Sequence, residues 1–201
     1  MATAETKHGV PSPEIPIEIR TERLFIRRLD AESDANDIFD IRSRMDVMKW
    51  SSTKTPDADI AATKKHFLHL CQPGALGLTV FEASNPNRAI ACIGFYKKNE
   101  NAELGYLFHP DFWGKGYATE AARAAINKWW ELATSASVPE KNSGVKESAK
   151  SELVLYADTD PLNAASNRVL TKCGFRKVEE IVDEIGPCFK WELHKEDTVT
   201  D

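Results

Sequence analysis

The sequence contains little that would support a metal centre, a disulfide framework or a membrane anchor. The four cysteines, Cys71, Cys92, Cys173 and Cys188, lie far apart and form neither a C-x-x-C pair nor a Cys/His ligand spacing. We therefore expect no metal and no disulfides. The N-terminal stretch is polar and contains proline without an apolar run, so we expect no signal peptide, no membrane partner and a cytoplasmic location.

A surplus of positive charge is also missing, because 31 acidic residues outnumber 26 Lys and Arg and leave a net charge of -5. A general nucleic-acid binder would need the opposite balance to neutralise phosphates, so we expect no nucleic-acid partner. With 201 residues, 42% of them hydrophobic, the chain can form one globular domain. We place it at 20–195, after a flexible arm at 1–19, with a surface insertion at 135–150 and a tail at 196–201.

The hydrophobic pattern predicts a mixed α/β fold built around one sheet. Asp160-Pro161 matches an N-cap followed by proline, and Leu162, Ala165 and Val169 are expected on the core face of the helix that follows. In chain order the pattern predicts a strand at 20–29, helices at 30–45 and 55–71, strands at 76–83, 89–97 and 102–109 with a turn at 84–87, a helix at 118–133, a strand at 153–157, a helix at 160–174, and strands at 175–183 and 188–194.

The segment Phe112–Ala121 carries two glycines directly before a long Ala-rich helix. Glycine lets the backbone turn tightly with successive N–H groups pointing inward, and the helix adds its unpaired N–H groups and the positive end of its dipole. Together these features predict an anion cradle, most naturally for phosphates. The spacing matches neither a Walker A loop nor a G-x-G-x-x-G fingerprint, and a purely structural turn remains an alternative.

A second polar feature lies on the later helix, where Asn163, Ser166, Asn167 and Leu170 recur at i, i+3, i+4 and i+7. Asn and Ser are unfavourable in helix interiors, so a stripe of them beside a buried face indicates an edge that faces a ligand. A solvated helix surface is the other interpretation.

Taken together, these segments resemble the GNAT superfamily of acyl-CoA-dependent N-acetyltransferases, in a branch similar to the ribosomal-protein N-terminal (alanine/serine) acetyltransferases. The resemblance implies a central, mostly antiparallel sheet of about seven strands flanked by helices and splayed between strands 4 and 5. It covers residues 20–195. The matching stretches are Thr21-Glu22-Arg23-Leu24, Ala102-Glu103-Leu104-Gly105-Tyr106, Trp113–Ala121, and Asn163–Leu170 continuing through Cys173-Gly174-Phe175.

The resemblance implies acetyl-CoA as cosubstrate and assigns most of the site. Main-chain groups of Leu107, Phe108 and His109 would hold the pantetheine arm, and Asn163 and Asn167 would lie beside the cofactor. The cradle for the pyrophosphate would be formed by Trp113, Gly114, Lys115, Gly116, Tyr117, Ala118 and Thr119. Trp113 departs from the family's commonest pattern, which begins with Gln or Arg; main-chain binding would survive this change.

Acetyl transfer needs a neutral amine, a stabilised oxyanion and a protonated leaving thiol. Glu103, beside the expected thioester, is the candidate base, with a surface carboxylate as the alternative. Ser166 is the candidate acid, because the tyrosine that many relatives carry on this helix is missing; Tyr106, Tyr117 and Tyr156 are further candidates, and solvent could also serve. Cys173 is expected in the core, so a direct attack in a ternary complex is favoured over a covalent intermediate.

The leading function is therefore acetyl transfer from acetyl-CoA to a primary amine, with a protein or peptide N-terminus as acceptor. Residues 30–75 form the expected acceptor region, where Trp50 would line the cleft. A small-amine acetyltransferase, a non-catalytic acyl-CoA-binding module and an unrelated phosphate-binding domain remain alternatives. The protein is expected to be a monomer or a homodimer.

Overall fold

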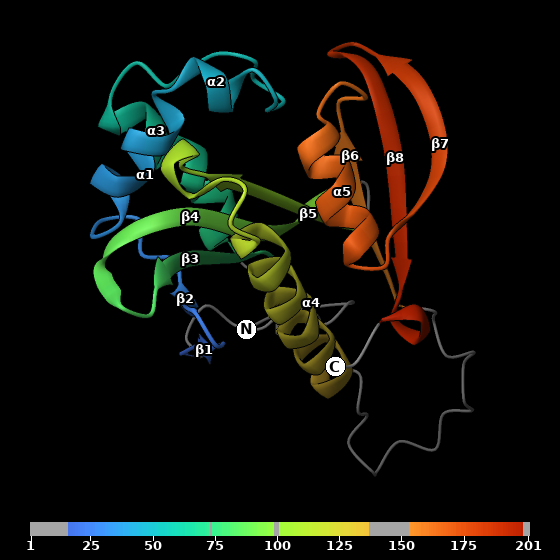
Figure 1. The fold of residues 1–201 in the computed structure, drawn as a ribbon, viewed down its shortest axis with the longest axis horizontal. Coiled ribbons are helices and arrows are strands. Elements are labelled where there is room, and N and C mark those ends of the chain that lie inside the picture. The colour runs from blue at the N-terminus through green and yellow to red at the C-terminus, as the bar shows by residue number, and fades with distance from the viewer. Residues whose placement is uncertain (1–15, 73, 99–100, 137–152, 199–201) are drawn as a thin grey trace, which may run out of the picture.

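The computed structural model describes residues 16–72, 74–98, 101–136 and 153–198 (Figure 1). They form a mixed α/β fold around an eight-stranded sheet of order β1-β2-β3-β4-β5-β6-β8-β7. Among the described strands, all neighbours are antiparallel except β5 and β6. The strands are β1 (Glu18–Arg20), β2 (Leu24–Arg28), β3 (Leu76–Glu82), β4 (Asn85–Lys98), β5 (Asn101–Phe108), β6 (Val154–Thr159), β7 (Arg176–Asp183) and β8 (Gly186–His194). The predicted mixed α/β class is thereby confirmed.

Helices cover both faces of the sheet. The helices are α1 (Ala35–Arg42), α2 (Met45–Met48), α3 (Ile60–Phe67), α4 (Tyr117–Ala136) and α5 (Ala164–Lys172), with short 3-10 turns at Leu68–Cys71, Pro110–Phe112 and Lys195–Asp197. On one face, α4 buries its small residues and stacks Trp129 on Phe95 with ring centroids 4.9 Å apart. On the other, Ile38 of α1 and Phe67 of α3 pack on Leu29 and Cys92. Among the described residues, no helix combines the length and apolarity needed to cross a bilayer.

The expected splay lies between the two parallel strands. Within the part of the chain that the structure describes, β5 and β6 pair only at Ala102↔Leu155 and Glu103↔Tyr156, whereas β6 pairs with β8 on its other edge from Val154 to Thr159. Figure 1 shows the two halves of the sheet diverging from this point, with α5 beside the opening. Tyr106 and Phe108 therefore lie on an edge of β5 that β6 does not cover.

The N-terminal boundary differs from the expected one. Ile17 is buried and Glu18–Arg20 pair with β2 as an eighth strand, so the ordered chain begins before residue 20. Isoleucine at 17 and 19 supplies the alternation that a strand needs. Residues 1–15 of the predicted arm and residues 137–150 of the predicted insertion lie outside the described residues. In the tail, Lys195–Asp197 form a 3-10 turn.

The predicted hairpin turn at 84–87 and the predicted helix cap at Asp160 are also wrong. The hairpin turns at Ala83-Ser84, and the Asn-Pro-Asn stretch belongs to β4, which carries extra residues opposite the end of β3 at Val80–Glu82. The last helix begins at Ala164, with Asn163 as its N-cap, because the Asp160 carboxylate accepts the N–H of Leu162 and turns the chain first.

The later start also corrects the predicted core face of α5. Leu162 is 81% exposed and Ala165 is exposed as well, so these two predicted core positions are wrong. Val169 packs against the core and Cys173 is buried, as predicted. Leu170, which was predicted on the polar stripe, is buried too, and Asn163 and Ser166 face the opening of the sheet.

Candidate active site

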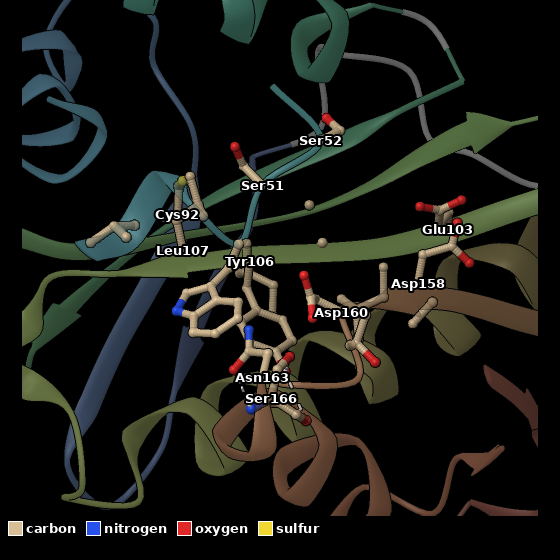
Figure 2. A pocket seen from close by; sticks show the side chains of 18 of the residues that line it. Ser51, Ser52, Cys92, Glu103, Tyr106, Leu107, Asp158, Asp160, Asn163 and Ser166 are labelled. Atoms are coloured by element: carbon tan, nitrogen blue, oxygen red, sulfur yellow. Dashed lines mark hydrogen bonds between the residues drawn. The ribbon is translucent and has the colours of Figure 1, made fainter. Parts of the chain in front are cut away.

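A cavity of about 670 Å³ fills the opening of the sheet (Figure 2). It is lined by the segment between α2 and α3, by β5 and β6, by α5 and by the β7–β8 turn; we call it the central cavity. Seven of the predicted site residues line it: Glu103, Leu107, Phe108, Trp113, Ala118, Asn163 and Ser166. Trp50 lines it too, on the side expected for the acceptor.

The ladder between β4 and β5 determines which main-chain groups face the central cavity. The N–H of His109 donates to the carbonyl of Ile90, and the register continues through Cys92↔Leu107. Backbone groups on an antiparallel strand alternate in direction, so those of Leu107 and His109 point to β4. Those of Tyr106 and Phe108 point to the uncovered edge. The candidate contacts to an extended ligand are therefore on these two residues.

Trp113 forms one border of this edge. Its indole Nε1–H donates to the Phe108 carbonyl at 2.8 Å, which fixes the half-exposed ring beside the strand. Trp113 thus uses one of the outward main-chain acceptors and leaves the N–H groups of Tyr106 and Phe108 facing the cavity.

The Gly-rich segment has the geometry of an anion cradle. Gly114 and Gly116 have φ values of 75° and 82°, in the left-handed region that favours glycine. The first helical hydrogen bond of α4 runs from the Glu120 N–H to the Gly116 carbonyl, so the amides of residues 117–119 precede the helical ladder. An added Cβ at Gly114 would meet nothing within 4 Å, so the described structure leaves space at this turn.

Arg23 and Glu120 hold this segment from outside. Arg23 donates Nε–H to Glu120 Oε2 at 2.8 Å and an Nη1–H to the Lys115 carbonyl at 2.9 Å. Thr21 and the Arg23 N–H both donate to Glu120 Oε1. We call this group the loop clamp. It gives the Thr-Glu-Arg-Leu stretch a structural role that the sequence did not indicate.

Several predicted cofactor residues lie outside the lining of the central cavity. Tyr117 donates its hydroxyl to Glu82, and Lys115 lies 4.9 Å from the Phe112 ring centroid. Asn167 accepts from the Thr159 hydroxyl at 2.6 Å and donates to the Pro161 carbonyl, so its amide stabilises the β6–α5 connection. The buried His109 ring faces α1, with Nε2 3.4 Å from the Asp40 carboxylate.

Glu103 lies on the cavity wall and is 6% exposed. The hydroxyl of Tyr96, its cross-strand neighbour on β4, donates to Glu103 Oε1 at 2.5 Å. Burial and the Glu103 charge raise the pKa of Tyr96, so this hydroxyl keeps its proton and orients the carboxylate. Tyr96 also lines the cavity, and nothing in the sequence pattern indicated this pair.

Ser166 is joined to a tyrosine from the opposite wall. The Tyr106 hydroxyl lies 2.7 Å from Ser166 Oγ, and either oxygen can donate. Burial raises the pKa of Tyr106, which keeps the phenol protonated. The helix has no tyrosine of its own, but β5 brings one to it. Asn163 also faces the cavity, and its side-chain oxygen accepts the Ser166 N–H as the helix cap.

The cysteines beside the site are poor nucleophiles. Cys92 lines the central cavity, but burial raises the pKa of its thiol to about 11. Burial has the same effect on Cys173, which lies in the core as predicted. Because the thiolate is the reactive form, neither is activated for covalent transfer. Within the described ranges, no three His, Cys, Asp or Glu side chains gather as a metal site would require.

Fold and site together define an acyltransferase: an uncovered strand edge, an anion cradle at one end and a carboxylate and hydroxyl pair within one cavity. The family model of the acetyltransferase (GNAT) domain matches residues 23–176. The chain therefore belongs to the GNAT acetyltransferases, and it is an acetyl-CoA-dependent N-acetyltransferase.

Relatives agree with this assignment. An uncharacterized N-acetyltransferase, YoaA of Bacillus subtilis (strain 168), is 26% identical over 164 residues, which is 79% of this chain and 82% of the relative. A GNAT-family acetyltransferase from Bacillus anthracis superposes with a TM-score of 0.67 at 22% identity, over 90% of this chain and 99% of that one. Spermidine N-acetyltransferase from Vibrio cholerae, solved with CoA and spermine, superposes with a TM-score of 0.69 at 14% identity, over 88% of this chain and 98% of that one.

Proposed function

We propose that this chain transfers the acetyl group of acetyl-CoA directly to a primary amine in a ternary complex. The observation that carries the proposal is the placement of Glu103 and Ser166 in one cavity, at the point where β5 loses its partner. The pantetheine arm is proposed to follow the Tyr106 and Phe108 edge as an added strand would, with the pyrophosphate on the amides of residues 114–119.

Acetyl-CoA supplies a thioester that an amine can attack. Glu103 accepts the proton of the acceptor ammonium, directly or through a water, and frees the lone pair of the nitrogen. The N–H of Tyr106 or Phe108 donates to the developing oxyanion. As the new C–N bond forms and the C–S bond breaks, the Ser166 hydroxyl protonates the departing sulfur and is resupplied through Tyr106. The raised cysteine pKa values support this single-step route over a covalent one.

The proposed acceptor is a protein or peptide N-terminus, as in the ribosomal-protein N-terminal acetyltransferases. The small-amine alternative is supported by the spermidine enzyme, whose structure with spermine shares this fold. A second alternative is an acyl-CoA-binding module without turnover.

The first experiment is calorimetric titration with acetyl-CoA, with ADP as control, followed by CoA release assays with N-terminal peptides and small amines. The proposal expects micromolar binding that favours acetyl-CoA, and CoA release that depends on the amine. Binding without amine-dependent release would identify a non-catalytic module. Absence of binding would contradict the cradle.

A further inference from the structure

One carboxylate on the cavity wall is held by the backbone and offers one oxygen to the cavity. Asp160 Oδ1 accepts the Leu162 N–H at 2.9 Å, which fixes the side chain in the turn before α5. Asp160 Oδ2 accepts from Lys54 Nζ at 3.1 Å. Figure 2 shows Asp160 pointing into the central cavity above Asn163. The protein therefore already binds a primary ammonium at this oxygen.

That ammonium comes from the opposite wall. Lys54 lies in the segment between α2 and α3, 106 residues from Asp160 in sequence, and its own side chain lines the cavity. Its φ of 55° is in a region that side-chain-bearing residues rarely adopt. Both partners are partly accessible, at 36% for Lys54 and 20% for Asp160. An incoming cation can thus reach the carboxylate, and Lys54 can turn to solvent.

The other cavity carboxylates are engaged differently. Asp158 pairs with Lys190, which lies outside the cavity lining, at 2.6 Å. Glu103 accepts the Tyr96 hydroxyl, and Asp183 accepts main-chain N–H groups of its own turn. Asp160 therefore differs from Asp158 in that its lysine partner shares the cavity with it.

We propose that Asp160 binds a second, non-reacting ammonium group of the acceptor, and that Lys54 occupies this position until the acceptor displaces it. This inference rests on the proposed acetyl transfer. The attacking nitrogen must be neutral, so a carboxylate that holds a charged ammonium serves the non-reacting group. When the acceptor ammonium replaces that of Lys54, the Asp160 carboxylate still has one positive partner. The acceptor class is a diamine or polyamine, or a peptide N-terminus followed by a lysine.

The test compares matched acceptors that differ in the second charge. The pairs are 1,4-diaminobutane against butylamine, and an Ala-Lys-Ala amide against an Ala-Leu-Ala amide. We take whichever pair contains an acceptor that the enzyme acetylates and divide kcat/KM of the doubly charged acceptor by kcat/KM of its singly charged analogue. This ratio should fall about tenfold in Asp160→Asn. Asparagine keeps the oxygen that accepts the Leu162 N–H, so the turn should survive. Lys54→Met should raise the same ratio about threefold, because the internal competitor is gone.

Asp46→Asn is the matched control, because it removes one exposed carboxylate that pairs with Arg44. Its ratio should equal that of the wild type. Equal ratios in the wild type and Asp160→Asn would overturn the inference while amine-dependent turnover stands. If no amine is turned over, calorimetry of 1,4-diaminobutane binding to the CoA-saturated protein decides: binding weakened in Asp160→Asn supports the inference, and no binding overturns it.

Discussion

The two ends of the central cavity are built in different ways. The end where we propose that the cofactor binds, the cofactor end, is one contiguous segment, residues 113–119, in which two glycines adopt positive φ. The end where we propose that the acceptor binds, the acceptor end, is built from side-chain pairs between separate segments, such as Lys54 with Asp160, 106 positions apart, and Arg42 with Asp57, 15 positions apart. A site that binds through main-chain groups tolerates most side-chain substitutions. A site that binds through side chains changes its ligand contacts with each substitution. The fold can therefore keep one cosubstrate while its acceptor varies.

Glu103→Gln is expected to have the largest effect, because it removes the proton acceptor between the two ends. Turnover at pH 7 should fall on the order of 10³-fold, and less at alkaline pH, where free amine is present without a base. Steady-state CoA release from pH 6.5 to 10 measures this loss. Glu179→Gln, on the exposed face of β7, is the control. Identical pH profiles for Glu103→Gln and the wild type would eliminate Glu103 as the base.

Asp57→Asn tests the scaffold of the acceptor end. The buried Asp57 carboxylate receives Arg42 Nε–H at 2.6 Å and Nη2–H at 3.0 Å, and also the Thr63 hydroxyl. Removal of its charge leaves the Arg42 guanidinium buried without a counter-ion, so unfolding free energy at pH 7 should drop by about 3–5 kcal/mol. Acetyl-CoA affinity of the folded fraction should stay unchanged. Urea unfolding and calorimetry measure the two quantities.

The stabilisation by the Asp57 ion pair should decrease as the pH falls. Burial acts to raise the pKa of Asp57, but the hydrogen bonds from Arg42 and Thr63 outweigh it and lower the pKa below its ordinary value of 3.8. The stabilisation is thus complete above pH 3.8 and disappears as pH falls through the lowered value. Wild-type and Asp57→Asn stabilities should converge in acid. A constant difference down to that range would contradict the ion-pair explanation.

Gly116→Trp tests the main-chain character of the cofactor end. A side chain there is strained at a φ of 82° and fills the cradle next to Arg23, so acetyl-CoA affinity should fall about 100-fold. Gly74→Trp, at a φ of 96° with open space around it, separates backbone strain from blockage. Unchanged calorimetric binding in Gly116→Trp would eliminate the cradle assignment.

The smallest effect is expected at the hydroxyl pair. Ser166→Ala and Tyr106→Phe should each lower kcat about tenfold, because solvent can still protonate a thiolate. The double variant should lose no more than either single one, since the two hydroxyls act as one unit. Ser52→Ala, elsewhere on the cavity wall, is the control. Multiplicative losses would show that the two groups act separately.

The same division explains what the sequence could predict. The turn at Gly114 and Gly116 depends on local conformation, and the core face of α4 follows from its own period, so both were predictable. The anion cradle was predicted from the same glycines and stays a prediction, whereas the splay of the sheet was implied only by the family resemblance. The strand at 18–20 was not predicted, because three residues are too few for an alternating pattern that would distinguish a strand from an irregular arm.

The acceptor end could not be predicted because its contacts are long-range. Nothing near Ser166 points to Tyr106, 60 residues earlier, and nothing near Lys54 points to Asp160. Asp160-Pro161 looked like a helix cap, but the same carboxylate can accept an N–H two residues on. That turn moved the cap to Asn163 and left Leu162 exposed before the helix begins. Competing local bonds of similar strength are decided by tertiary packing.

The loop clamp also bears on how the protein is made. Arg23 lies between β1 and β2, and its partners Lys115 and Glu120 lie 92 and 97 positions later. During synthesis the glycine segment cannot take its clamped shape until α4 has emerged and docked on β2. We therefore expect affinity for acetyl-CoA to arise only after α4 has packed against β2. An amino-terminal truncation past Thr21 should thus weaken a binding site about a hundred residues away.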